Sequence, residues 1–76
     1  MLTDVKIIDA REESCPMPLL LLARALSTLQ SDEILTLLLD PNESVKDIKR
    51  LCHARGYLLL SEDIVDECRR INIKKD

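Results

Sequence analysis

The segment Cys15-Pro16-Met17-Pro18 holds the residues whose types and spacing best suit covalent chemistry. It stands at the expected start of a Leu- and Ala-rich helix over residues 16–29. If Cys15 is the N-cap, both prolines fall in the first turn, where backbone N–H groups have no intrahelical acceptor and proline is tolerated. Met17 then keeps the N–H group that is best placed to reach the Cys15 sulfur.

The positive end of the helix dipole and the Met17 N–H both favour a sulfur anion at Cys15. We therefore expect a thiolate or a persulfide at this position. The only histidine, His53, belongs to a second expected helix, so no general base stands beside the cysteine, and a group-carrying sulfur fits better than a hydrolytic nucleophile. The alternative is that Cys15 is an unreactive residue that happens to precede a proline, although cysteine is a poor N-cap.

The elements that must position this cysteine follow the order β-α-β-α-β-β. A second helix begins at Ser44, which with Asp47 resembles a capping box, and ends at Gly56 in the position where a left-handed residue is favoured. The order predicts an α/β fold, a two-layer sandwich in which a four-stranded mixed sheet carries both helices on one face and leaves the other face open. We expect one domain over residues 1–76. The predicted strands cover residues 5–8, 33–39, 58–60 and 67–74, with a turn over 61–66.

Length and composition exclude several classes of protein. A chain of 76 residues has little room for a deep enclosed pocket. A net charge of −3 and a single aromatic residue, Tyr57, disfavour direct nucleic-acid binding, and a single glycine excludes a glycine-rich phosphate loop. Three widely spaced cysteines and no signal-peptide pattern indicate a cytoplasmic protein, and no apolar run is long enough to cross a membrane.

The remaining candidate ligands and nucleophiles point to no second site. Cys52 shares the apolar face of the second helix and is expected in the core. Cys68 lies opposite in phase to the apolar residues of the last strand, so an exposed thiol that resolves Cys15 is an open alternative. The spacing of these thiols and His53 matches no metal site, and no cofactor is expected. The basic clusters Lys49-Arg50, Arg55, Arg69-Arg70 and Lys74-Lys75 are interpreted as solvated faces.

The first helix carries more leucine than one buried face can use. At 100° per residue, the face suited to the sheet comprises Leu19, Leu22, Ala23, Leu26 and Leu29. Met17, Leu20 and Leu21 then point away from the sheet, alongside Arg24. They are either scattered exposed apolar residues or a docking patch beside Cys15 for a partner protein.

Residues along nearly the whole chain resemble the TusA/SirA-like sulfur-carrier family, and the Cys-Pro-x-Pro motif is the specific part of the match. The resemblance implies a fold similar to the C-terminal domain of bacterial translation initiation factor three. It also implies that Cys15 bears the sulfur and that Pro16, Met17 and Pro18 position it. The matching residues are Asp9-Ala10-Arg11, Cys15-Pro16-Met17-Pro18-Leu19-Leu20, Arg24, Glu33, Asp47-Ile48, Cys52, Gly56 and Ile73-Lys74-Lys75.

What the resemblance implies is a sulfur relay. In the family, a cysteine desulfurase or rhodanese-type donor supplies sulfane sulfur, the motif cysteine carries it as a persulfide, and an acceptor protein receives it for tRNA thiolation, cofactor sulfuration or sulfur oxidation. This chain departs from the family pattern at Glu12 and Glu13, at Asp32, and at Pro41-Asn42. The two glutamates oppose a sulfur anion by about 1 kcal/mol, which is similar to the opposing effect of the helix start.

The alternative from another functional class is a non-catalytic protein-binding or regulatory module of the same fold. On that interpretation Glu12 and Glu13 mark a partner interface that does not transfer sulfur. A thiol-based redox sensor that uses Cys15 and Cys68 is a third hypothesis.

Overall fold

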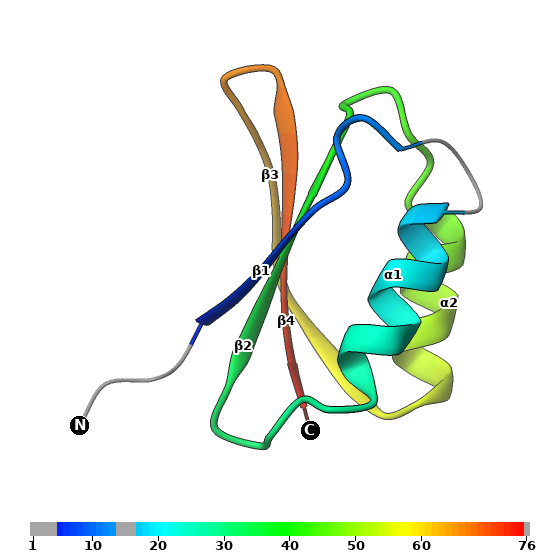
Figure 1. The fold of residues 1–76 in the computed structure, drawn as a ribbon, viewed down its shortest axis with the longest axis vertical. Coiled ribbons are helices and arrows are strands. Elements are labelled where there is room, and N and C mark those ends of the chain that lie inside the picture. The colour runs from blue at the N-terminus through cyan, green and yellow to red at the C-terminus, as the bar shows by residue number, and fades with distance from the viewer. Residues whose placement is uncertain (1–4, 14–16, 76) are drawn as a thin grey trace.

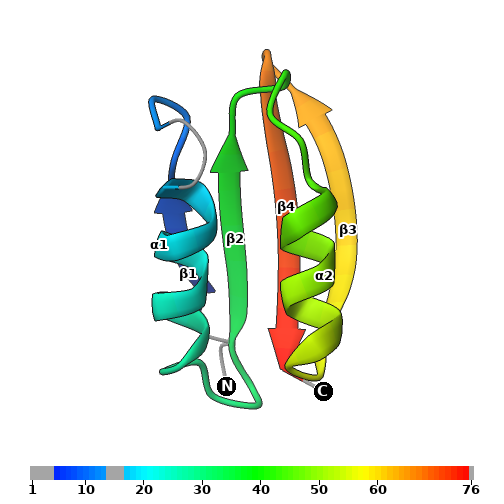
Figure 2. The same ribbon diagram turned by 90° about the vertical axis from the view of Figure 1, so that its right-hand side faces the viewer.

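The computed structural model describes residues 5–13 and 17–75. Its elements follow the predicted order β-α-β-α-β-β (Figure 1). The two helices cover one face of a mixed sheet, so the predicted two-layer α/β sandwich is confirmed (Figures 1 and 2). The bounds are β1 Val5–Asp9, α1 Met17–Leu26, β2 Ile34–Leu39, α2 Lys46–Ala54, β3 Tyr57–Val65 and β4 Cys68–Lys75.

The described strands form one four-stranded sheet in the order β1-β2-β4-β3. β1 and β2 are parallel, whereas β4 runs antiparallel to both of its neighbours, β2 and β3. A helix follows each of the parallel strands, so α1 and α2 begin at the same end of the sheet (Figure 2). The described parts of the loops that lead into the two helices therefore lie at one end of the molecule (Figure 2).

The core lies between the sheet and the helices. Alternate residues of the two central strands point inward, as the period of a strand requires, and α1 contributes Leu22 and Leu26. Each fully buried leucine or isoleucine stabilises the fold by roughly 2 kcal/mol through the water that it excludes. The apolar strand residues of the core are Leu35, Leu37, Leu39, Ile71 and Ile73, each with no exposed surface.

The first helix ends three residues earlier than predicted, at Leu26. The Ser27 hydroxyl donates to the carbonyl oxygen of Arg24 at 2.7 Å, and the Thr28 hydroxyl donates to that of Ala25 at 3.1 Å. These side chains satisfy carbonyl groups that the next helical turn would have used. Leu29 is nevertheless buried, as predicted.

The second helix also differs from its prediction at its start. The residue before the helix is Val45, which makes no side-chain cap, so the predicted capping box of Ser44 and Asp47 is wrong. The Ser44 hydroxyl instead accepts a hydrogen bond from the Lys46 N–H at 3.4 Å. At the other end Gly56 has a φ of 75°, which confirms the predicted left-handed residue after the helix.

The third strand is much longer than the predicted residues 58–60, and the predicted turn over 61–66 is wrong. β3 continues to Val65 across a bulge between Leu59 and Ser61. The turn into β4 is the pair Asp66 and Glu67, whose φ angles are 52° and 60°. Glycine normally occupies such a turn because it tolerates positive φ, and the pair Asp66-Glu67 contains none, so the sequence did not mark the position of the turn.

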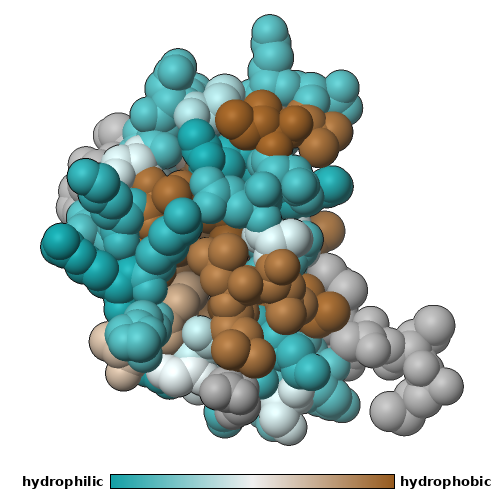
Figure 3. All heavy atoms as spheres, turned by 180° about the vertical axis from the view of Figure 1, so that it is seen from behind, coloured by the Kyte–Doolittle hydropathy of each residue, from teal (hydrophilic) through white to brown (hydrophobic). Residues whose placement is uncertain are grey.

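β3 forms one edge of the sheet and faces the viewer in the view from behind, where apolar surface is visible (Figure 3). The exposed apolar residues of this strand are Leu58, Leu60, Ile64 and Val65. The bulge and the charged residues Glu62 and Asp63 interrupt that row, as is common in edge strands. In the part of the chain that is described, no helix is long and apolar enough to cross a membrane.

Candidate functional site

Cys15 and Pro16, the first two residues of the motif, lie outside the described residues. The site is therefore built from the segments on either side of them: the loop that leaves β1 and the first turns of α1. The structure does not test the predicted roles of Cys15 and Pro16, which stay predictions.

The loop after β1 is fixed against the sheet at its start. Ala10 is completely buried, and its N–H donates to the carbonyl oxygen of Leu38 at 2.9 Å. The N–H of Glu13 then donates to the carbonyl oxygen of Ala10 at 3.1 Å, which closes a turn. The chain thus reaches Glu13, two residues before the predicted sulfur-bearing cysteine, from a rigid base.

Asp9 and Arg11 form a bidentate ion pair in this loop. Nε and Nη2 of Arg11 donate to the two carboxylate oxygens of Asp9 at 2.8 and 2.7 Å, and the Arg11 backbone N–H donates to Oδ1 at 3.2 Å. These hydrogen bonds lower the pKa of Asp9 from 3.8 to about 2, and the Asp9 carboxylate raises the pKa of Arg11. The Asp9 carboxylate therefore neutralises the positive charge of Arg11.

An open cavity of about 500 Å³ lies over this loop, lined by Asp9, Arg11, Glu12 and Glu13. Among residues 5–13 and 17–75, no ion pair includes Glu12 or Glu13. Since Arg11 is paired with Asp9, these two glutamates leave the rim negatively charged. A partner that approaches the segment after Glu13 therefore meets an acidic surface.

The start of α1 divides its motif residues between surface and core. Met17 is 40% exposed and Leu20 is 55% exposed, in agreement with the predicted outward face, and Arg24 is exposed with them. Pro18 is buried. Leu21 departs from the prediction, because it is partly buried and packs against the core. Met17 and Leu20 thus supply the exposed apolar surface next to the motif.

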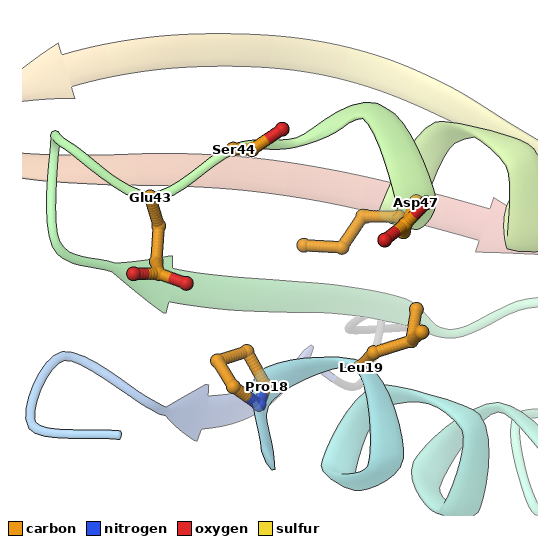
Figure 4. A pocket seen from close by; sticks show the side chains of 6 residues that line it. Pro18, Leu19, Glu43, Ser44 and Asp47 are labelled. Atoms are coloured by element: carbon orange, nitrogen blue, oxygen red, sulfur yellow. The ribbon is translucent and has the colours of Figure 1, made fainter. Parts of the chain in front are cut away.

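A second cavity, of about 50 Å³, lies between the starts of α1 and α2 (Figure 4). Pro18 and Leu19 line it from α1, and Ile48 from α2. Glu43, from the loop between β2 and α2, points its carboxylate toward Pro18, whereas Ser44 points away (Figure 4). The remaining lining residue is Asp47, in the first turn of α2.

Sequence reasoning missed this second cavity. No local sequence pattern marks Glu43, because it lines a cavity only where the fold brings it next to the start of α1. The signal that could have found it is the parallel pairing of β1 and β2, which brings the two following helices to one end of the sheet.

Arg69 fixes the loop that carries Glu43, contrary to the prediction that it lies on a solvated face. Its side chain is only 20% exposed and pairs with Glu62 on β3. Its Nη2 donates to the carbonyl oxygen of Pro41 at 2.9 Å, and Glu62 also contacts Nζ of Lys49 on α2 at 3.1 Å. These bonds connect β3, β4 and α2 with one another and with the loop between β2 and α2.

The other cysteines differ in their surroundings. Cys52 is buried in the core, as predicted, and burial raises the pKa of its thiol. Cys68 is partly buried next to the β3–β4 turn, and both thiols are free. His53 is exposed on α2, also as predicted. No group of three His, Cys, Asp or Glu residues able to hold a metal ion occurs among residues 5–13 and 17–75.

Comparison with known proteins shows to which family the chain belongs. The family model of the sulfurtransferase TusA matches residues 6–75. A protein of Methanocaldococcus jannaschii, named as a proposed sulfur carrier, is 31% identical over 75 residues that cover 99% of this chain and 100% of that protein. No solved structure gives a significant match. On the extent of the family match, the chain belongs to the TusA sulfurtransferase family.

Proposed function

We propose that this protein is a sulfur carrier that accepts sulfane sulfur on Cys15 as a persulfide and passes it to an acceptor protein. The observation that carries the proposal is the TusA family match over residues 6–75, a span that includes the whole Cys-Pro-x-Pro segment. The name of the Methanocaldococcus jannaschii relative points the same way.

The transfer step is an exchange between two sulfur centres. The Cys15 thiolate attacks the terminal sulfur of a donor persulfide, a new S–S bond forms on Cys15, and the donor cysteine leaves as a thiolate. One S–S bond forms and one breaks, so the step needs neither an external oxidant nor a cofactor of this chain. Delivery to the acceptor repeats the exchange with Cys15 as the leaving thiolate.

The donor in this proposal is a cysteine desulfurase or a rhodanese-type enzyme, and the acceptor is a protein of tRNA thiolation, cofactor sulfuration or sulfur metabolism. We place the carrier in the cytoplasm, where a reducing environment keeps cysteines free; the free thiols of Cys52 and Cys68 are compatible with that location. We assign partner contact to three exposed residues of α1: Met17, Leu20 and Arg24. Leu21 packs against the core beside them.

Intact mass spectrometry tests the proposal. The protein is incubated with a pyridoxal-dependent cysteine desulfurase and cysteine, with Cys15→Ser as the variant and Cys68→Ser as the matched control. We expect a sulfur-sized mass increase in the native chain and in Cys68→Ser, removed by reduction and absent in Cys15→Ser.

Two outcomes would contradict this assignment. No adduct from desulfurase or rhodanese donors would favour the non-catalytic binding module. A reducible adduct that persists in Cys15→Ser would place the carrier sulfur on another cysteine.

A further inference from the structure

The cavity between the starts of α1 and α2 combines apolar walls with an acidic rim. Its apolar lining includes Pro18, which is buried, and Ile48, which is 3% exposed. Glu43, in the loop before α2, and Asp47, in the first turn of α2, both line this small space (Figure 4). A long apolar stem with a cationic head is the side-chain chemistry that matches such a lining.

Few positive charges of the chain neutralise the carboxylates of Glu43 and Asp47. Asp47 has only a long contact with Arg50, 3.9 Å between exposed groups, and in the described part of the chain no ion pair includes Glu43. The starts of α1 and α2 each contribute about half a positive charge, which offsets only part of two full negative charges. The rim thus keeps a net attraction for a cation.

The charge around the cavity extends this pattern over the whole end of the molecule. Residues 9–13 and 40–47 contain six Asp or Glu residues and only two Lys or Arg residues. The chain as a whole has 14 acidic and 11 basic residues, so the acidic excess is concentrated where both helices begin. The exposed Met17 and Leu20 stand on the same helix start. A protein with a basic surface is therefore the partner that fits this end.

We propose that this cavity receives an arginine side chain of the protein that exchanges sulfur with Cys15; the assignment of that partner rests on the proposed function. The arginine methylenes pack on Pro18, Leu19 and Ile48, and the guanidinium lies between the carboxylates of Glu43 and Asp47. Arginine suits the position because its planar group offers five N–H donors in a fixed fork, which two carboxylates can share.

The cavity itself is tested by NMR titration, which involves no sulfur chemistry. The native chain receives N-acetyl-arginine amide, or the neutral isostere N-acetyl-citrulline amide. We expect dose-dependent shifts of the Leu19, Ser44 and Asp47 amide signals with the arginine probe, reduced about threefold or more in Glu43→Gln/Asp47→Asn. The control Asp32→Asn/Asp63→Asn removes the same charge elsewhere and keeps the shifts. Equal shifts with citrulline, or shifts unaffected by Glu43→Gln/Asp47→Asn, would overturn the cavity assignment.

The partner assignment is tested by the rate of sulfur loading from a cysteine desulfurase at varied carrier concentration. Glu43→Gln/Asp47→Asn should raise the half-saturating carrier concentration about threefold or more and leave the saturated rate unchanged. An unchanged half-saturating concentration would refute the arginine contact even if Cys15 loads normally. A native chain that takes up no sulfur would instead refute the proposed function, and the titration would still report on the cavity.

Discussion

The hydroxyl of Tyr57 donates a hydrogen bond to the backbone carbonyl oxygen of Leu26 at 2.7 Å. This bond joins the first residue of β3 to the last residue of α1, 31 positions earlier in the chain. The carbonyl groups of the last helical turn have no partner within the helix, so the only aromatic residue of the protein completes the end of α1.

Removal of that hydroxyl should weaken the fold without disturbing its packing. We expect Tyr57→Phe to lower the free energy of unfolding by about 1 kcal/mol, because the Leu26 carbonyl oxygen loses its donor while the ring remains. Urea denaturation followed by circular dichroism measures the change. An unfolding free energy equal to that of the native chain would mean that water replaces the hydroxyl without cost.

A substitution in the turn between β3 and β4 should change the free energy of unfolding in the opposite direction. Glu67 has a φ of 60°, a conformation that costs a residue with a side chain about 1 kcal/mol relative to glycine. Glu67→Gly should therefore raise the free energy of unfolding by about that amount. The matched control is Glu12→Gly, since Glu12 has no such positive φ, and it should bring no gain. A loss of stability in Glu67→Gly would show that the glutamate side chain makes a contact worth more than the relieved strain.

The Asp9–Arg11 pair predicts a pH dependence with a defined sign. The pKa of Asp9 is lowered to about 2 by the Arg11 hydrogen bonds, so its contribution to stability is fully present above the ordinary value of 3.8 and is lost as the pH falls through about 2. A carboxyl ¹³C NMR titration should give a midpoint near 2 for Asp9 in the native chain. The midpoint should return toward 3.8 in Arg11→Gln, and also in high salt, because the pair is exposed. An ordinary midpoint in the native chain at low salt would contradict the ion pair.

The cysteines should differ in their rates of alkylation. Cys52 is buried and its thiol pKa is raised, whereas Cys68 is only partly buried. In a Cys15→Ser background we expect iodoacetamide to modify Cys68 faster than Cys52 by on the order of tenfold or more. Peptide mass spectrometry over time measures both rates, and a denatured sample provides the control in which the two should converge. Equal rates in the folded protein would contradict the burial of Cys52.

The exposed residues at the start of α1 provide a test of partner contact. Met17→Glu/Leu20→Glu should slow sulfur loading from a desulfurase on the order of tenfold, because the charges face a surface that the partner must cover. Both residues are exposed, so the unfolding midpoint should stay close to that of the native chain. Leu21 is unsuitable for this test because it packs against the core. An unchanged loading rate in a folded double variant would remove these residues from the interface.

The sequence predicted those features that depend on local pattern. A mostly apolar run marked β2, the spacing of Ile71 and Ile73 marked the inner side of β4, and Gly56 marked the end of α2. The length of β3 was missed because Asp66 and Glu67 form its turn in a conformation typical of glycine and asparagine. The burial of Arg69 was missed because its partners, Glu62 and the Pro41 carbonyl, lie on other segments.

In the candidate site, too, the sequence predicted what depends on local pattern and missed what depends on contacts between distant segments. The Cys-Pro-x-Pro motif could be recognised because its residues are consecutive, and the exposed face with Met17 and Leu20 followed from helical period. The cavity beside Pro18 has no such local pattern, since Glu43 lies 25 positions from Pro18 and reaches it only through the tertiary fold.

The parallel pairing of β1 and β2 gives the molecule two unlike poles. Both helices begin at one pole, while β4 ends at Lys75 at the other (Figures 1 and 2). A surface tether or fluorophore attached at Lys75 therefore leaves the helix starts free. Sensor-chip and single-molecule experiments can hold the protein there and present the helix starts to partners in solution.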